Sequence, residues 1–323
     1  MHSTRSASAL QSALQYALAA AGAFAISALA PVHAQSHDGP GVNGAVIGDV
    51  LYSNDSDRFN EERGNLGYLF ANGWGLGASL THYSAPDWAA TGRGAYGLYR
   101  EHDAQQTVDA RLGVMDTDGH TTVTGTLDYM RHITADTGLG VSAERDVVDS
   151  IVGIEKGLTY NSLMLVLDHQ FTPRFTVGAV AGAFRFSDDN TRPLLRTRWN
   201  YELVANSGLN AYIKTRTYYD SNPYQGNYFS PRWLNEYSGG LSWRTALNDK
   251  VVFFVNADAG RQNTSDANTN IWSARIGLQN HRSRTVQWQI AVETTNDRAA
   301  GFVSSGGGYR YTSVTGRLMF PLN

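Results

Sequence analysis

The charged side chains of this sequence recur at every second position within short segments. In 195–203, Arg196, Arg198 and Glu202 alternate with the apolar or aromatic Leu195 and Trp199. A spacing of two places side chains on one face of a β-strand. Groups arranged in this way can form ion pairs, face water or hold a polar ligand, so the sequence predicts charged strand faces rather than one compact reactive cluster.

We assign acids and bases in equal numbers to this polar face. The basic members Arg196, Arg198, Lys214, Arg216 and Arg244 come from three consecutive segments and would form a stripe, whereas the acids are spread widely. Such a set can line a hydrated pore or link a wall by salt bridges, and both interpretations stay open. The residues assigned to the polar face are Asp109, Arg111, Asp128, Glu144, Asp168, Arg196, Arg198, Glu202, Tyr212, Lys214, Arg216, Arg244, Asp258, Arg275 and Glu293.

Catalytic motifs are missing from the sequence. It contains no Gly-x-Ser-x-Gly and no His-Glu-x-x-His, and among the scattered histidines only His169, beside Asp168, lies in the middle of a segment. We therefore expect no catalytic residue, no metal site and no cofactor, and we do not expect an enzyme. A triad assembled from separate segments remains the alternative.

Alternation of apolar and polar residues is the main structural signal. It is clear in Val251–Gly260 and Trp272–Gln279, whereas both faces of Phe175–Phe186 are apolar or small and Tyr309–Phe320 can be phased either way. A strand with lipid on one side and water on the other must alternate in this manner. The runs predict about sixteen strands of about ten residues, the length that a tilted strand needs to cross a bilayer.

The composition agrees with this fold class. The chain has 33 Gly, 17 Tyr, 12 Phe, 7 Trp and no Cys, and its formal net charge is −3. After residue 34 no stretch approaches the roughly 20 apolar residues of a spanning helix, and no basic excess suggests nucleic acid as a partner. The sequence predicts an all-β protein, a transmembrane antiparallel β-barrel in contact with membrane lipid.

The first residues look like a secretory signal. One positive charge, Arg5, precedes a long apolar run that ends in Pro-Val-His-Ala at Ala34. We expect a signal peptide at 1–34, a short periplasmic segment at 35–43 and an outer-membrane barrel at 44–323.

The expected connections alternate in length. Short ones such as Ala71–Gly73 and Leu247–Lys250 alternate with longer ones such as Asn54–Asn65, Asp146–Asn161 and Asp220–Leu234. Bacterial outer-membrane barrels have short periplasmic turns and long external loops. This rhythm predicts an outer-membrane location with both termini in the periplasm.

Four segments carry a further signal: the external segment 222–231, the segment 236–241 that follows it, and the segments 186–192 and 59–63. The external loop contains Asn222, Pro223, Tyr228, Phe229, Ser230 and Pro231. These segments resemble the barrels of exopolysaccharide export porins, which include the poly-N-acetylglucosamine porin and the C-terminal barrel of the cellulose synthase export subunit.

The resemblance implies a porin that exports a linear polysaccharide, poly-N-acetylglucosamine-like or cellulose-like, for a biofilm. Family members carry a tetratricopeptide region before the barrel. Here that role would fall to a separate periplasmic subunit, with an inner-membrane glycan synthase as a further partner. Tyr83, Tyr99, Tyr212 and Tyr218 would offer rings to sugars, although Tyr99 and Tyr218 also suit an interfacial girdle. The alternatives are a general diffusion porin, an outer-membrane hydrolase of the lipase or deacylase type, and a surface-attachment barrel.

Overall fold

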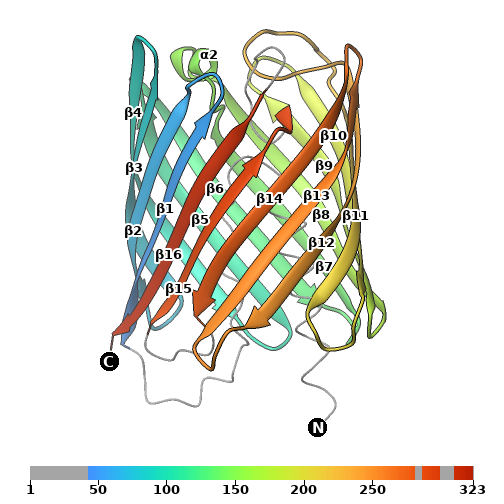
Figure 1. Cartoon of the computed structure of the whole chain (residues 1–323). Helices are drawn as coiled ribbons and strands as arrows, with labels where there is room; N and C mark the ends of the chain where they lie inside the picture. Colours follow the sequence, from blue (N-terminus) through green and yellow to red (C-terminus); the bar gives the residue numbers. More distant parts are fainter. Residues whose placement is uncertain (1–42, 281–285, 299–308, 323) are drawn as a thin grey trace.

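The chain forms a closed antiparallel barrel of sixteen strands (Figure 1). The computed structural model describes residues 43–280, 286–298 and 309–322. Each strand pairs with the next along the chain, and β1 pairs with β16 from Gly44↔Leu322 to Asp55↔Tyr311, which closes the sheet. The predicted fold class and strand number are confirmed.

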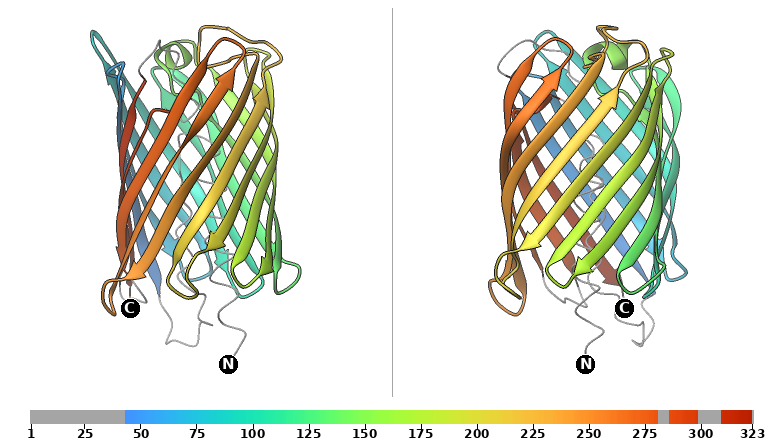
Figure 2. Two further views of the ribbon diagram at one scale, coloured as in Figure 1. Left: turned by 45° about the vertical axis from the view of Figure 1, so that its right-hand side comes forward. Right: turned by 90° about the vertical axis from the view of Figure 1, so that its right-hand side faces the viewer.

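The strands are 9 to 15 residues long, and in the views of Figure 2 they are inclined to the barrel axis. Their bounds are β1 (Gly44–Asp55), β2 (Asn60–Phe70), β3 (Trp74–Ala85), β4 (Trp88–His102), β5 (Gln106–Thr117), β6 (His120–His132), β7 (Thr137–Val147), β8 (Thr159–Thr172), β9 (Phe175–Phe186), β10 (Thr191–Glu202), β11 (Leu209–Tyr219), β12 (Trp233–Ala246), β13 (Val251–Thr264), β14 (Asn268–Asn280), β15 (Gln287–Thr295) and β16 (Tyr311–Leu322). One short helix, α2 (Ile151–Glu155), lies between β7 and β8.

Apolar side chains cover the outside of the wall. Leu112 on β5 and Leu163 and Leu165 on β8 are 60–67% exposed. The two leucines of β8 alternate with buried Met164 and Val166. Exposed leucines in such number would be unfavourable in water, but they suit contact with lipid tails. The outward face is therefore the lipid-facing one, and the alternate positions face the interior.

Aromatic side chains gather near the ends of this apolar surface. Trp74 packs on Tyr99 with ring centroids 4.9 Å apart, and Phe171 stacks on Phe175 at 5.6 Å. Such rings favour the boundary between lipid and water. Of the two positions that the sequence left open for Tyr99, the structure shows the girdle: near the end of β4, the ring faces its neighbour Trp74 on the outside.

The two ends of the barrel differ. One end, which we call the turn end, carries the connections that follow even-numbered strands; there Asn43 N–H donates to Leu322 O at 3.0 Å, so both described chain ends meet. The opposite, loop end carries the long connections 148–158 and 220–232. Its β5–β6 turn is nevertheless only Asp118-Gly119, with φ of 51° and 81°, the conformation that an Asp-Gly hairpin favours.

One expected loop is much shorter than predicted. The span Asn54–Asn65 was expected to be a long loop, but β1 continues to Asp55 and β2 begins at Asn60. The run Asn60–Asn65 is acidic and polar, so it was predicted to be a loop; it is the first half of β2, and its interior face is charged. The proposed signal peptide at 1–34, the segment up to residue 42, His281–Arg284 and most of Asn296–Gly308 lie outside the described residues.

Within 43–280, 286–298 and 309–322, no helix is long and apolar enough to span a membrane.

We predict that Leu165→Arg, in the middle of the outer face of β8, lowers the free energy of unfolding by about 2–4 kcal/mol, because the charge would lie in hydrocarbon. Thr126→Arg, on the interior face of β6, should cost much less. Urea titration of the barrel in lipid vesicles measures both. Equal losses in the two variants would contradict the assignment of faces.

Candidate functional site: the barrel interior and its mouth

The interior wall is the candidate site, because it brings together most of the charged residues of the strands. Contacts between strands that are not hydrogen-bonded neighbours establish the inward direction. Arg111 on β5 lies 3.6 Å from Asp49 on β1, and Tyr212 Oη on β11 donates to Asp258 on β13 at 2.9 Å. Such contacts span the concave side of the wall.

The structure places all fifteen residues of the expected polar face at interior positions. These are Asp109, Arg111, Asp128, Glu144, Asp168, Arg196, Arg198, Glu202, Tyr212, Lys214, Arg216, Arg244, Asp258, Arg275 and Glu293.

Several of these residues make local contacts that stiffen the wall. Glu202 accepts from Gly208 N–H at 3.3 Å and so closes the β10–β11 turn. Asp109 accepts from Arg100 at 2.6 Å and contacts His102 Nε2 at 2.7 Å. These groups serve the wall itself, which is one of the two interpretations that the sequence left open.

One part of the interior wall is acidic, and a part close to it along the circumference carries a cluster of bases. The interior positions of β6, β7 and β8 carry Asp128, Glu144, Asp146 and Asp168 and no arginine or lysine, and those of β9 carry no charge. The basic side chains follow directly on β10 and β11. The predicted stripe is therefore separated from an acidic wall by one uncharged strand.

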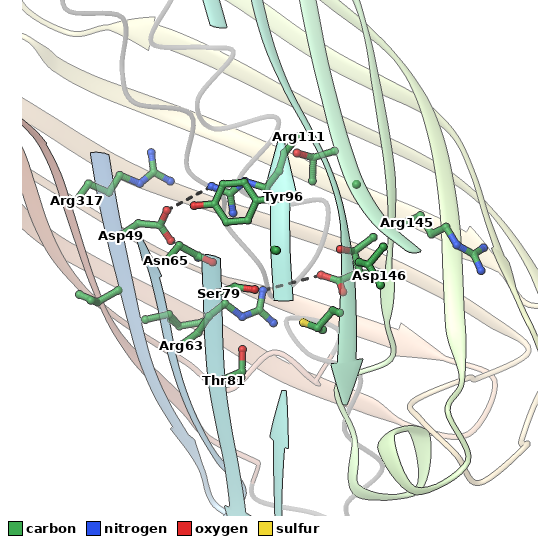
Figure 3. Close-up of a pocket in the computed structure, with 18 of the residues that line it drawn as sticks. Asp49, Arg63, Asn65, Ser79, Thr81, Tyr96, Arg111, Arg145, Asp146 and Arg317 are labelled. Carbon is green, nitrogen blue, oxygen red and sulfur yellow. Dashed lines mark hydrogen bonds and ion pairs between the residues drawn. The ribbon is translucent and has the colours of Figure 1, made fainter. Parts of the chain in front are cut away.

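Further interior charges were not identified from the sequence. Arg63 on β2 lay in the expected loop, and Arg317 lies on β16, whose phase the sequence left open. Figure 3 shows them with Arg111 around a pocket that Asp49 and Asp146 also line. Arg63 lies 3.9 Å from Asp146. Pairing of β16 with β1, which sets Asp49 opposite Arg317, supplies the phase that sequence could not.

The β7–β8 connection folds into the mouth at the loop end. Ser150 caps α2 by accepting from Gly153 N–H at 2.9 Å. Ile154 is fully buried in a cluster with Phe59, Tyr83 and Met115, which come from the β1–β2 turn, β3 and β5. This connection therefore reaches from β7 over β5 and β3 to the β1–β2 turn.

The β11–β12 connection also folds back onto the barrel. Tyr228 is 2% exposed and stacks on Phe186 with ring centroids 4.5 Å apart. Asn190 Nδ2 donates to Tyr228 Oη at 3.0 Å, and Arg192 donates to Asp220 at 2.8 Å and to Phe229 O at 2.7 Å. Burial raises the pKa of Asp220, and the Arg192 guanidinium opposes this effect.

The segment that resembles the export barrels is thus an anchored structure. Asn222 N–H donates to Asn190 Oδ1 at 3.0 Å, and Tyr224 N–H donates to Ser230 O at 2.8 Å. Asn227 joins this loop to the β7–β8 connection, because it accepts from Ser150 Oγ at 2.6 Å and from Lys156 Nζ at 2.9 Å. The remaining members of the motif, Pro223, Phe229 and Pro231, lie in the same loop.

His169 and Asp168 do not form a catalytic pair. They lie on opposite faces of β8: Asp168 faces the interior, whereas His169 Nδ1 contacts Thr137 Oγ1 at 2.9 Å and its ring packs against Phe171. Adjacent residues of a strand point apart.

Solved structures share this fold. A bacterial polysaccharide outer membrane secretin matches with a TM-score of 0.66 and 12% identity, over 87% of this chain and 99% of its own. CdiB from Acinetobacter baumannii matches with a TM-score of 0.52 and 12% identity, over 86% of this chain and 60% of its own. No family model and no curated protein matches the sequence. At these identities the likeness defines the fold, a closed transmembrane β-barrel.

We predict that Tyr228→Ala releases the 220–232 loop, because it removes a buried ring and two hydrogen bonds of its hydroxyl, a loss of about 3–5 kcal/mol for a large aromatic side chain. Proteinase K added to intact barrels should then cut the loop much faster. Tyr224→Ala is the matched control, since Tyr224 is 53% exposed in the same loop. Equal cutting rates in both variants would contradict the anchoring role.

Asp149 gives the mouth a pH dependence. It is 5% exposed and accepts from Tyr83 Oη at 2.8 Å. Burial raises the pKa of Asp149, and the charge of Glu61 raises it further, against the opposing effect of Arg63. The folded state therefore binds this proton more tightly, and the contribution of Asp149 to the free energy of unfolding should rise as pH falls toward about 4, the ordinary aspartate pKa.

Asp149→Asn should remove this contribution, so the free energy of unfolding measured by urea titration should rise less, as pH falls, than in the wild type. Asp103→Asn is the control, because the contribution of Asp103 to the free energy of unfolding should change with pH in the opposite direction. Backbone N–H groups of Gln105 and Gln106 donate to Asp103 and lower its pKa, so acid weakens its contribution to stability. Identical pH profiles for the wild type and Asp149→Asn would refute the assignment.

Proposed function

We propose that the chain is an outer-membrane porin through which a linear exopolysaccharide leaves the cell. The observation that carries this proposal is the interior of the closed barrel, a wall that carries acids, bases and tyrosines. A barrel of about sixteen strands encloses an aqueous path, and many moderate polar contacts suit a sugar chain that must keep moving.

Arginine–tyrosine stacks run along this wall. The Arg198 guanidinium lies 3.6 Å from the centre of the Tyr212 ring, Arg111 lies 4.2 Å from Tyr96 and Arg192 lies 4.4 Å from Tyr218. Stacked in this way, the planar groups hold one another in place along the interior wall. The similar barrel described as a polysaccharide secretin supports the same function.

The proposal includes an orientation and partners. The loop end would face the outside and the turn end the periplasm, with both termini there. A separate tetratricopeptide-type subunit would guide the glycan to the turn end from an inner-membrane synthase. Neither partner would need to enter the lumen.

A general diffusion porin is the second candidate. It is favoured by the inward-folded β7–β8 connection, because a diffusion porin needs a loop that narrows its channel. In this barrel that connection lies at the mouth, where it is fixed to Asn227. Uptake of small solutes should then change in Tyr228→Ala, whose loop at the mouth is released, whereas glycan secretion should not depend on the gene.

The test is deletion of the gene followed by complementation, with surface polysaccharide as the measurement. We expect loss of the polysaccharide and its recovery with the wild type. Thr126→Trp, inside the barrel, should lower secretion several-fold by narrowing the path, whereas Leu127→Trp on the adjacent outward position should restore it. Unchanged polysaccharide after deletion would refute the export function.

A further inference from the structure

Four cations face one another across two neighbouring rungs of the interior wall. The β10–β11 ladder sets Arg196 opposite Arg216 and Arg198 opposite Lys214. We call these four residues the cationic patch. Side chains opposite each other in a sheet lie about 5 Å apart at Cβ, and like charges placed so are destabilising. The patch therefore needs counter-charges.

Carboxylates supply part of this counter-charge, and the ion pairs described next are all made with the two β11 members of the patch. Arg216 donates to Glu236 Oε1 at 2.7 Å and also pairs with Asp297. Lys214 Nζ lies 2.9 Å from Asp258 Oδ2. On the other side, β9 sets Val180 opposite Arg196 and Gly178 opposite Arg198, so that strand offers no acid to the patch.

Arg196 keeps unused donors. Its side chain is 8% exposed, yet in the described part of the chain its Nε and Nη1 are buried without any hydrogen-bond partner. A buried donor that stays unpaired is costly, and more so when it is charged. The cost is relieved when a ligand supplies the acceptor.

Two further polar groups without partners lie beside the patch. Tyr218 Oη on β11 and Ser238 Oγ on β12 are buried, and neither has a hydrogen-bond partner among the residues that the structure describes. Tyr218 is two residues along β11 from Arg216, and Ser238 lies opposite Lys214. Guanidinium, phenol and hydroxyl groups without partners thus occupy nearby interior positions on the three consecutive strands β10, β11 and β12.

We propose that this stretch is a binding site for the carboxylate of an acidic sugar unit. Nε and Nη1 of Arg196 lie on different edges of the guanidinium, and each can donate a charge-assisted hydrogen bond, Nη1 to a carboxylate oxygen and Nε to a neighbouring acceptor of the same sugar unit. Tyr218 and Ser238 are placed to bond the sugar hydroxyls beside it. The inference rests on the proposed passage of a glycan and specifies its class: a polysaccharide that contains uronic acids.

The experiment measures channel block in planar lipid bilayers, with protein purified from the outer membrane. Oligomers of glucuronic acid should block the wild-type channel at least about tenfold more tightly than cello-oligosaccharides of the same length, as expected for one charged hydrogen-bonding group. Arg196→Gln should remove this preference and shift the reversal potential in a KCl gradient toward cations. Arg196→Lys should keep the ion selectivity but lose most of the preference for glucuronate, because it retains the charge without the two fixed guanidinium donors.

Arg185→Gln is the matched control, since it removes one positive charge from the outward face of the neighbouring strand β9. It should behave as the wild type. If Arg196→Gln does not assemble, Tyr218→Phe tests the same site by removing one unpaired donor, and should weaken glucuronate block several-fold.

Equal block by the two oligomers in the wild type would overturn the inference, and so would an unchanged preference in Arg196→Gln or in Tyr218→Phe. This outcome is separable from failure of the proposed function. A barrel that secretes a neutral glycan would fail here and still lose surface polysaccharide when its gene is deleted.

Discussion

The structure depends on one requirement: in hydrocarbon, every backbone N–H and C=O must find its partner within the sheet. Pairing of β1 with β16 over the full length of both strands removes the last open edge. Without that pairing, two rows of peptide groups would face lipid, at a cost of several kilocalories per mole for each group. The barrel is therefore either closed or unstable in the membrane.

Closure of the barrel divides the side chains into a lipid-facing set and a lumen-facing set. Because neighbours along a strand point to opposite sides, one wall presents leucines and valines to lipid and arginines and carboxylates to the lumen. The same geometry separates Asp168 from His169, which are adjacent in sequence but divided by the wall. A charged residue has only the interior available in mid-membrane, so charges of the same sign can be brought together there.

The mouth is stabilised by a different kind of interaction. Burial of Ile154 and Tyr228 attaches two connections to the wall, and Asn227 attaches them to each other. These contacts resemble a small protein core built on top of the barrel. They let the loop end hold a defined shape while the wall below keeps its polar interior.

The sequence by itself determined the strand pattern, because a period of two is a local property: β10, β13 and β14 could be phased from their own residues, and the interior positions of Arg196 and Asp258 followed. Tertiary structure alone decided what depends on distant partners. Arg317 acquires its phase from Asp49, Tyr99 its outward position from Trp74, and the 220–232 loop its fold from Asn190 and Ser150. The β9 strand, apolar on both faces, could not be phased, because the packing of Phe184 and Phe186 against Tyr160 and Tyr228 replaces water on its interior side near the mouth. Local alternation records which environment each face meets, whereas contacts between residues far apart in the chain form only when the barrel closes.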